Sequence, residues 1–222
     1  MIVAGKNPML WCDMLIVGLT GGLASGKSTI AQIFQQYGAW IIDADCLTRE
    51  VVKPHRVAWK DIIRTFGRTI LTEQNTVNRA ALADTVFGNP RKLKQLTNIL
   101  YPRVAREQAR IVRQVVQKNL EAVIIYDAAM LIESDAYTRM DRVIVVTANQ
   151  RIQIQRACQR TGMSRAEAVR RIRHQMPLPE KKRYADYVIN GALPLPQLRP
   201  IVRNLYRLFQ KEARQKTAPL RI

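Results

Sequence analysis

The stretch that decides the fold is Gly18-Leu19-Thr20-Gly21-Gly22-Leu23-Ala24-Ser25-Gly26-Lys27-Ser28-Thr29. Gly21, four residues and then Gly26-Lys27-Ser28 match the phosphate-binding P-loop pattern. The apolar run from Met14 to Val17 predicts a strand before the loop. Apolar residues at helical spacing predict a helix after it: Ile30, Ile33, Phe34 and Tyr37. A glycine-rich turn can match the pattern by chance, but strand, loop and helix in this order favour a phosphate site.

Each residue type in this loop suits a bound phosphate. Glycines let backbone N–H groups approach phosphate oxygens, and the helix that follows adds unpaired donors and the positive end of its dipole. Lys27 is expected to reach the β- and γ-phosphates of ATP, and the Ser28 hydroxyl to ligate Mg²⁺. The predicted nucleotide-binding residues are Gly22, Leu23, Ala24, Ser25, Gly26, Lys27, Ser28 and Thr29.

Length and composition suit an intracellular globular protein. The 222 residues, 47% of them hydrophobic, are typical of one domain with a proper core. No apolar run has the length of a membrane span, and the first residues lack the pattern of a secretory signal, so we expect a cytoplasmic protein. The three cysteines (Cys12, Cys46 and Cys158) are far apart and indicate free thiols. Cysteine and histidine show no zinc spacing, which leaves Mg²⁺ as the expected metal.

The positive charge is large and uneven. The net charge is +19, and two segments supply 14 of these charges: residues 151–183 with +8 and residues 199–222 with +6. Such a field attracts polyanionic ligands. Composition alone leaves open whether the polyanion is a nucleotide or a nucleic acid.

Five apolar runs separated by helical segments predict an α/β fold with a parallel sheet and right-handed crossovers. After the first run they are Ala39–Asp45, Ala122–Asp127, Arg142–Thr147 and Tyr187–Ile189. Asp43, Asp45 and Asp127 stand at the carboxyl ends of predicted strands, where ligands bind in such sheets. Because side chains two apart in a strand point the same way, we predict that Asp43 and Asp45 form one acidic pair. The alternative is that they cap the next helix.

The other segments are predicted to be helical. Residues 46–118 contain no convincing strand and break at Pro54, Gly67, Gly88–Pro90 and Pro102. Residues 151–175 are helical and basic with a break at Thr161-Gly162, and Arg156 and Arg160 share one helix face there, as phosphate ligands or as a solvated surface. The last helix, 195–215, is predicted to bury Leu198, Ile201, Val202, Leu205, Leu208 and Phe209.

From about Leu15 to Phe209 the chain resembles the dephospho-CoA kinase family. The similar pieces are Gly18-Leu19-Thr20-Gly21-Gly22 leading into the P-loop, Ile42-Asp43-Ala44-Asp45 with Arg49-Glu50-Val51-Val52, Asn78-Arg79-Ala80-Ala81-Leu82 with Val86-Phe87, Gln175-Met176-Pro177, Glu180-Lys181 and Ala185-Asp186-Tyr187-Val188-Ile189. The resemblance implies ATP-dependent phosphorylation of the ribose 3′-hydroxyl of dephospho-CoA, giving coenzyme A and ADP. It implies Asp45 as catalytic base with Asp43 in support, Thr20 near the acceptor, and Arg156 on the ATP phosphates.

The resemblance also implies an α/β, three-layer P-loop NTPase fold with a five-stranded parallel sheet. We predict an extension at residues 1–13 and a single domain at 14–222. Within the domain the core is 14–45, 119–150 and 185–215, the helical acceptor lobe is 46–118, and the helical lid is 151–184. We expect ATP, Mg²⁺ and dephospho-CoA as ligands, no membrane, no nucleic acid, and a monomer.

Four positions depart from the family pattern. Ala24 replaces a glycine, and we expect its φ angle to stay negative because alanine tolerates little else. Ala129 replaces a proline, Tyr101 replaces a histidine, and Asn190-Gly191 replaces Asp-Asn. Two alternatives stay open: another small-molecule kinase of the same fold, for a nucleoside monophosphate or a shikimate-like acceptor, and a nucleic-acid-binding P-loop ATPase.

Overall fold

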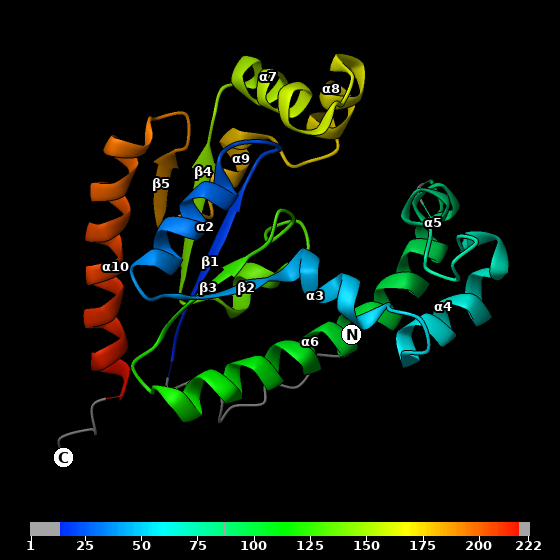
Figure 1. The fold of residues 1–222 in the computed structure, drawn as a ribbon, viewed down its shortest axis with the longest axis horizontal. Helices are drawn as coiled ribbons and strands as arrows, with labels where there is room; N and C mark the ends of the chain where they lie inside the picture. The colour runs from blue at the N-terminus through cyan, green and yellow to red at the C-terminus, as the bar shows by residue number, and fades with distance from the viewer. Residues whose placement is uncertain (1–13, 87, 218–222) are drawn as a thin grey trace. The chain divides into compact units, whose positions relative to one another are not determined.

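The computed structural model describes residues 14–86 and 88–217 of the 222-residue chain (Figure 1). The predicted extension at residues 1–13 lies outside these ranges. The chain divides into two compact units: the first runs to Asp43 and resumes at Val115, and the second comprises Ala44–Gln114. The second boundary falls inside one long helix, α6 (Pro90–Lys118), so a single helix belongs to both units.

The first unit is built on five parallel strands in the order β2-β3-β1-β4-β5. They are β1 (Leu15–Gly21), β2 (Trp40–Asp43), β3 (Val123–Asp127), β4 (Arg142–Thr147) and β5 (Tyr187–Asn190). Every residue of β1 and β3 is buried, as expected for inner strands of a sheet covered on both faces. The predicted α/β fold with a five-stranded parallel sheet is therefore confirmed.

Two strand boundaries differ from the sequence prediction. β1 continues through Gly21, four residues beyond the predicted end at Val17, because it is hydrogen-bonded to β3 on one side and β4 on the other. Gly18 pairs with both neighbouring strands, and a Cβ there would clash with the side chains of Leu131 and Met140, which explains a glycine at this position. β2 ends at Asp43, and Ala44 already begins α3 (Ala44–Val51).

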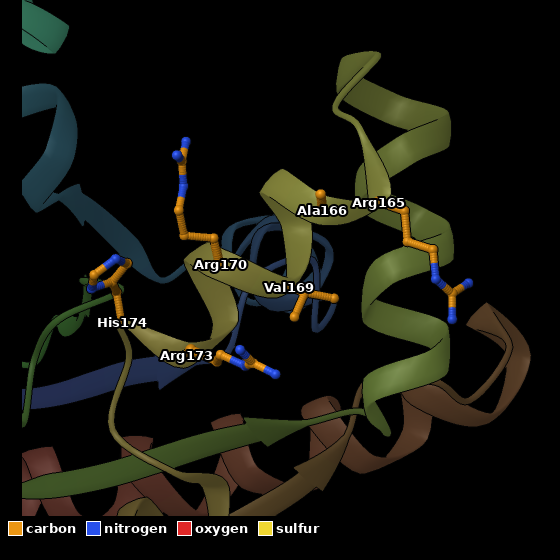
Figure 2. A pocket seen from close by; sticks show the side chains of 6 residues that line it. All are labelled: Arg165, Ala166, Val169, Arg170, Arg173 and His174. Carbon is orange, nitrogen blue, oxygen red and sulfur yellow. The ribbon is translucent and has the colours of Figure 1, made fainter.

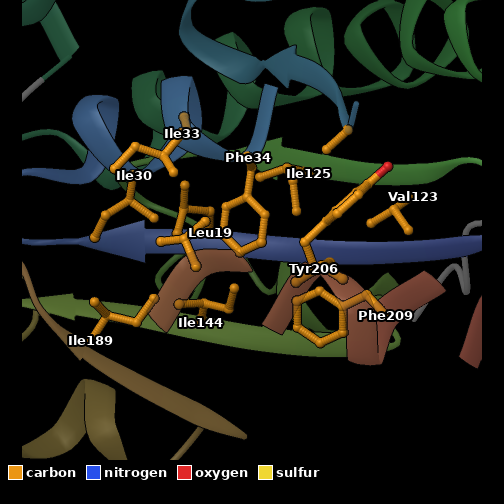
Figure 3. Close-up of a cluster of buried hydrophobic side chains, with 14 of the residues drawn as sticks. Leu19, Ile30, Ile33, Phe34, Val123, Ile125, Ile144, Ile189, Tyr206 and Phe209 are labelled. Carbon is orange, nitrogen blue, oxygen red and sulfur yellow. The ribbon is translucent and has the colours of Figure 1, made fainter. Parts of the chain in front are cut away.

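One face of the sheet is covered by α2 (Lys27–Gln36) and α10 (Leu195–Thr217), which pack against each other and against β1 (Figures 1 and 3). Phe34 of α2 stacks on Phe209 of α10, with 6.2 Å between ring centroids. The prediction for α10 is wrong at Ile201 and Leu208, which are exposed; Tyr206 and Ala213 are buried in their place. The buried residues of α10 recur in steps of three or four, so the true apolar stripe excludes these two.

Three helices and a short turn complete the first unit. They are η2 (Ala136–Arg139), α7 (Gln150–Thr161), α8 (Arg165–Arg173) and α9 (Leu178–Lys182). The Asn149 side chain caps α7 by accepting the Ile152 N–H, and Ser164 caps α8 by accepting the Glu167 N–H. Gly162 ends α7 at a φ angle of 65°, a left-handed conformation that glycine adopts without strain. The predicted break at Thr161-Gly162 is confirmed.

The second unit is helical and has its own core. It contains α3, α4 (Val57–Phe66), η1 (Arg68–Ile70), α5 (Arg79–Val86) and the first part of α6. The buried residues of one core cluster in this unit are Ile62, Ile70, Leu82, Val86 and Leu96. Asp61 of α4 forms an ion pair with Arg103 of α6 and so ties these two helices together. The predicted break at Pro102 is wrong: α6 runs through Pro102, which removes one helical N–H donor without ending the helix.

Candidate functional site

The P-loop joins β1 to α2. Residues 22–26 lie between Gly21, the last residue of β1, and Lys27, the first residue of α2, while Ser28 and Thr29 continue the first turn. The Ser25 N–H donates to the Gly22 carbonyl (3.1 Å), and Gly26 turns the chain into α2 at a φ angle of 100°. The N-cap residue Gly26 has no side chain that could occupy the first N–H groups of α2, which suits the binding of an anion there. The eight predicted nucleotide-binding residues form one continuous loop and helix start.

The loop after β5 packs directly on the P-loop. A Cβ on Gly191 would clash with the Ser25 carbonyl oxygen, and a Cβ on Gly26 would lie 2.8 Å from the Gly191 carbonyl oxygen. Two backbone segments meet here with no room for a side chain on either. This contact gives a physical reason for glycine at position 191.

Ala24 has a φ angle of 51°, so the prediction of a negative φ is wrong. The left-handed conformation costs a non-glycine residue roughly 1–2 kcal/mol. Leu23 and Ala24 pack against an apolar cluster of α7 and α8 that contains Ile154, Ala157 and Ala168. The methyl group of Ala24 thus gains contacts in α7 and α8 that glycine lacks, which offsets part of the strain.

Lys27 and Asp127 form an ion pair at the carboxyl end of β3. Both side chains are largely buried, with 16% of Lys27 and 8% of Asp127 exposed. Asp43 is the register partner of Asp127 on the neighbouring strand, and parallel partners direct their side chains to the same face. The sequence analysis named Asp127 as a candidate carboxylate, and the structure brings it to the P-loop lysine.

Asp45 lies in the first turn of α3, in the second unit, and is exposed. The prediction that Asp43 and Asp45 project from one strand face is therefore wrong. The prediction assumed that side chains alternate along a strand as far as Asp45, but this strand, β2, ends at Asp43. The apolar pattern could not show that the helix begins before the second acid.

Arg156 and Arg160 have different surroundings on α7. The Arg156 guanidinium donates from Nη1 to the Gly191 carbonyl (2.8 Å), which fixes it beside the P-loop contact. Arg160 is exposed. Thr20 is fully buried and its hydroxyl donates to the Ala129 carbonyl (3.2 Å). Direct contact between Thr20 and an acceptor would therefore need a rearrangement of the chain.

Sequence reasoning missed a second contact between the P-loop and the segment after α8. The Leu23 N–H donates to Oε1 of Gln175 (2.9 Å). The Gln153 side chain of α7 lies over Gly22, in the space that a Cβ would occupy. The only signal for these contacts was the piece Gln175-Met176-Pro177, which the family resemblance marked without giving it a role.

A cavity of about 840 Å³ lies along α8 (Figure 2). Six residues line it, and three of them are arginines: Arg165, Ala166, Val169, Arg170, Arg173 and His174. Arg171, one position away, instead pairs with Glu167 on the same helix (2.7 Å). The cavity concentrates part of the positive charge of residues 151–183 on one helix, while the P-loop residues are not among its lining.

The oxygen ligands that Mg²⁺ prefers are present beside the P-loop. Within the described ranges no cluster of three or more His, Cys, Asp or Glu side chains forms a metal cage. Mg²⁺ in phosphoryl-transfer sites usually keeps several waters and takes one or two protein ligands plus phosphate oxygens, so a cage is not required. The Ser28 hydroxyl and the carboxylates of Asp43 and Asp127 are ligands of this kind.

Comparison with known proteins identifies the family. A family model described as dephospho-CoA kinase matches residues 15–194. The chain belongs to the dephospho-CoA kinase family. A dephospho-CoA kinase of Geobacter metallireducens is 43% identical over 179 residues, which are 80% of this chain and 88% of the relative. That of Carboxydothermus hydrogenoformans is 41% identical over 177 residues, 80% of this chain and 85% of the relative.

A solved structure has a similar fold. A crystal structure of a Thermus thermophilus protein superposes with a TM-score of 0.76 at 28% identity and covers 88% of this chain and 98% of that one. The predicted P-loop NTPase fold class and the predicted kinase family are thus confirmed. Among the helices of the described ranges, none combines the length and apolar character needed to cross a bilayer.

Proposed function

We propose that this dephospho-CoA kinase family member transfers the γ-phosphoryl group of ATP to the ribose 3′-hydroxyl of dephospho-CoA, giving coenzyme A and ADP. The observation that carries the proposal is the ion pair of Lys27 with Asp127 at the junction of the P-loop and the sheet edge. A P-loop lysine held there can exchange its carboxylate partner for the β- and γ-phosphates when ATP binds. Family membership supplies the acceptor, because the matching relatives are named for it.

The residues of this chain divide the work of phosphoryl transfer. The backbone of residues 22–26 and the start of α2 hold the phosphates. Lys27 stabilises the charge that develops on the transferring group, and Arg156, held at the Gly191 carbonyl, does so from α7. Thr20 supports the acceptor side through the Ala129 carbonyl.

Asp45 is proposed as the general base. Its carboxylate takes the proton of the 3′-hydroxyl while the ribose oxygen bonds to the γ-phosphorus and the bond to the β-phosphate oxygen breaks. Ser28, Asp43 and Asp127 would hold Mg²⁺, which would supply positive charge against the phosphate groups. Asp43 therefore belongs with the phosphate-binding side, which is a different role from that of Asp45.

The remaining proposals concern the setting. We propose ATP, Mg²⁺ and dephospho-CoA as the ligands, a cytoplasmic location and a monomer. Among the cysteines that the structure describes, Cys46 is exposed and Cys158 half-buried, and neither forms a disulfide, which suits a reducing compartment. The lobe predicted at residues 46–118 and the lid predicted at 151–184 are proposed as the acceptor-binding and phosphate-closing parts.

The reaction is tested by ADP release from ATP and Mg²⁺ with four candidate acceptors: dephospho-CoA, AMP, shikimate and gluconate. We expect ADP only with dephospho-CoA, and a product heavier by one phosphoryl group. The Lys27→Ala variant, prepared in the same way, controls for contaminating kinases. Comparable turnover of AMP or shikimate would overturn the assignment of the acceptor. Tight binding of RNA at 0.2 M salt would revive the nucleic-acid alternative.

A further inference from the structure

The first unit contains a buried ion pair between Lys181 and Glu133. Lys181 of α9 is only 1% exposed, and its ammonium group contacts Oε1 of Glu133 (2.9 Å). A lysine buried to this degree needs partners, because an isolated buried charge is very costly. The same ammonium group also donates to the Ala129 carbonyl (3.0 Å).

Each partner of Lys181 has a second contact, and these contacts lead to the P-loop. The Ala129 carbonyl also accepts a hydrogen bond from the hydroxyl of Thr20, the second-last residue of β1 before the loop. Oε1 of Glu133 also accepts the Met176 N–H (3.0 Å). The residue before Met176 is Gln175, whose side chain accepts the Leu23 N–H of the P-loop.

The network therefore reaches the P-loop from two sides. One arm goes through Ala129 to Thr20 in β1, and the other goes through Glu133, Met176 and Gln175 to Leu23. The segment between Asp127 and Glu133 also carries the partner of Lys27 at its start. Within the described ranges, the polar contacts of Lys181 and Glu133 are with each other, with the Ala129 carbonyl and with the Met176 N–H, and none is with the P-loop.

We propose that Lys181 and Glu133 are positioning residues, which set the geometry of the P-loop and of the segment after β3 for phosphoryl transfer. The proposal rests on the proposed function and deepens it. It assigns a role to Glu133, and also to Lys181 and Gln175, whose segments the sequence resemblance marked without explanation. Because the network ends on backbone N–H and carbonyl groups, small displacements of these ends move the phosphate cradle as a whole.

The competing explanation is that Lys181 and Glu133 only stabilise the fold. Replacing both residues together distinguishes this explanation from a positioning role. Removing one member leaves a buried uncompensated charge, so Lys181→Met alone should lower both the melting temperature and activity. Replacing both with apolar residues of similar size often restores stability. The double variant Lys181→Met/Glu133→Met should thus melt within a few degrees of wild type.

The double variant should nevertheless turn over at least about tenfold more slowly, because the Ala129 carbonyl and the Met176 N–H have lost their anchors. Gln175→Leu, which removes only the last link to Leu23, should lower turnover with the ion pair intact. The matched controls are Arg214→Met/Glu121→Met, which removes an exposed long-range pair of the same unit, and Gln159→Leu at an exposed position of α7. Both controls should keep wild-type turnover.

The rise in melting temperature on adding ATP and Mg²⁺ gives a reading that is independent of the acceptor. We expect this rise to be at least halved in the double variant. Recovery of both turnover and the ATP-dependent rise together with stability would overturn the positioning role. If the wild-type protein does not phosphorylate dephospho-CoA but its melting temperature still rises with ATP and Mg²⁺, the proposed acceptor is wrong. The positioning role is then tested by comparing this rise between the wild type and the double variant.

Discussion

The two units of the molecule use charge in different ways. In the first unit, the two ion pairs at the candidate site join residues far apart in sequence and lie largely buried: Lys27–Asp127 and Lys181–Glu133. The other ion pairs of this unit, such as Arg214–Glu121, are more exposed. In the second unit most pairs join residues three apart in sequence and are exposed on at least one side: Lys53–Glu50, Arg64–Asp61 and Arg110–Glu107. Arg103–Asp61, between α6 and α4, is the exception.

This difference between the ion pairs indicates which unit needs its residues held in a precise geometry. Breaking a buried pair costs roughly 3–5 kcal/mol, whereas an exposed pair contributes about 0.2–1 kcal/mol. The first unit therefore fixes its phosphate-binding loop with contacts that tolerate little change. The second unit is held by its apolar core, with Ile62, Ile70 and Leu82 at its centre. Substitutions in the two units should accordingly have different consequences.

The largest effect should come from Asp45 in the second unit. Asp45→Asn keeps size and hydrogen bonding but removes the proposed proton acceptor, so phosphorylation of dephospho-CoA should slow by about a hundred- to ten-thousand-fold. ATP binding and the melting temperature should stay near wild type, because Asp45 is exposed. Steady-state turnover and thermal melts test this. Normal turnover with a melting temperature lowered by several degrees would make Asp45 a helix cap.

Asp43→Asn gives the comparison across the unit boundary. Asp43 lies beside Asp127 in the sheet, and part of its defect should be relieved by raising the Mg²⁺ concentration. The Asp45→Asn defect should not respond in this way. Equal Mg²⁺ responses of the two variants would contradict the separation of their roles.

The next largest effect is expected at Lys27 in the first unit. Lys27→Ala removes a charge that interacts more strongly with the transition state than with bound ATP, and turnover should fall by about a hundred- to a thousand-fold. It also leaves the carboxylate of Asp127 without the lysine, so the melting temperature should fall too. Turnover within a factor of two of wild type would contradict the P-loop assignment.

A smaller loss is expected at Arg156. Arg156→Ala should lower turnover more than it weakens ATP binding to the free enzyme, because we expect full phosphate contact only when both substrates are bound. Arg156→Lys should not fully restore turnover, because lysine lacks the planar fork. Arg160→Ala on the exposed face of α7 is the matched control. Equal losses of affinity and turnover would indicate a simple ground-state contact.

Ala24 tests backbone strain in the P-loop. Ala24→Val should destabilise the fold by at least about 1 kcal/mol, because a β-branched residue is poorly tolerated at a φ angle of 51°. Ala24→Gly should change the melting temperature much less, since relief of strain is offset by the lost methyl contacts and by the freer unfolded chain. Differential scanning calorimetry measures both, and a more stable valine variant would contradict the conformation.

The smallest effect is expected at Glu107 on α6. The hydrogen bond from Arg110 lowers the pKa of the Glu107 carboxyl from its ordinary value. A lowered pKa in the folded state stabilises the fold above the ordinary pKa, and this contribution is lost as the pH falls through the folded pKa. Glu107→Gln should change the melting temperature by no more than about two degrees at pH 7 and by less below pH 4. A larger change in melting temperature at pH 4 than at pH 7 would contradict the lowered pKa of Glu107.

The sequence by itself determined the fold class, the phosphate loop and the family. Continuous apolar runs identify buried parallel strands, and the spacing of Gly21, Gly26 and Lys27 specifies a loop whose chemistry is local. Both signals are contained in short stretches of chain. The structure describes all of the predicted site residues, from Thr20 to Arg156, but their catalytic and binding roles stay predictions.

Tertiary structure decided what depends on residues far apart in the chain. It ended β2 at Asp43 and so separated Asp45 from it, gave Ala24 a positive φ angle against α7 and α8, and carried α6 through Pro102. It also joined Lys27 to Asp127, Gly191 to the P-loop, and Lys181 to Glu133. Buried charges and close backbone approaches need partners supplied by the whole fold, and such partners have no signature in the local pattern.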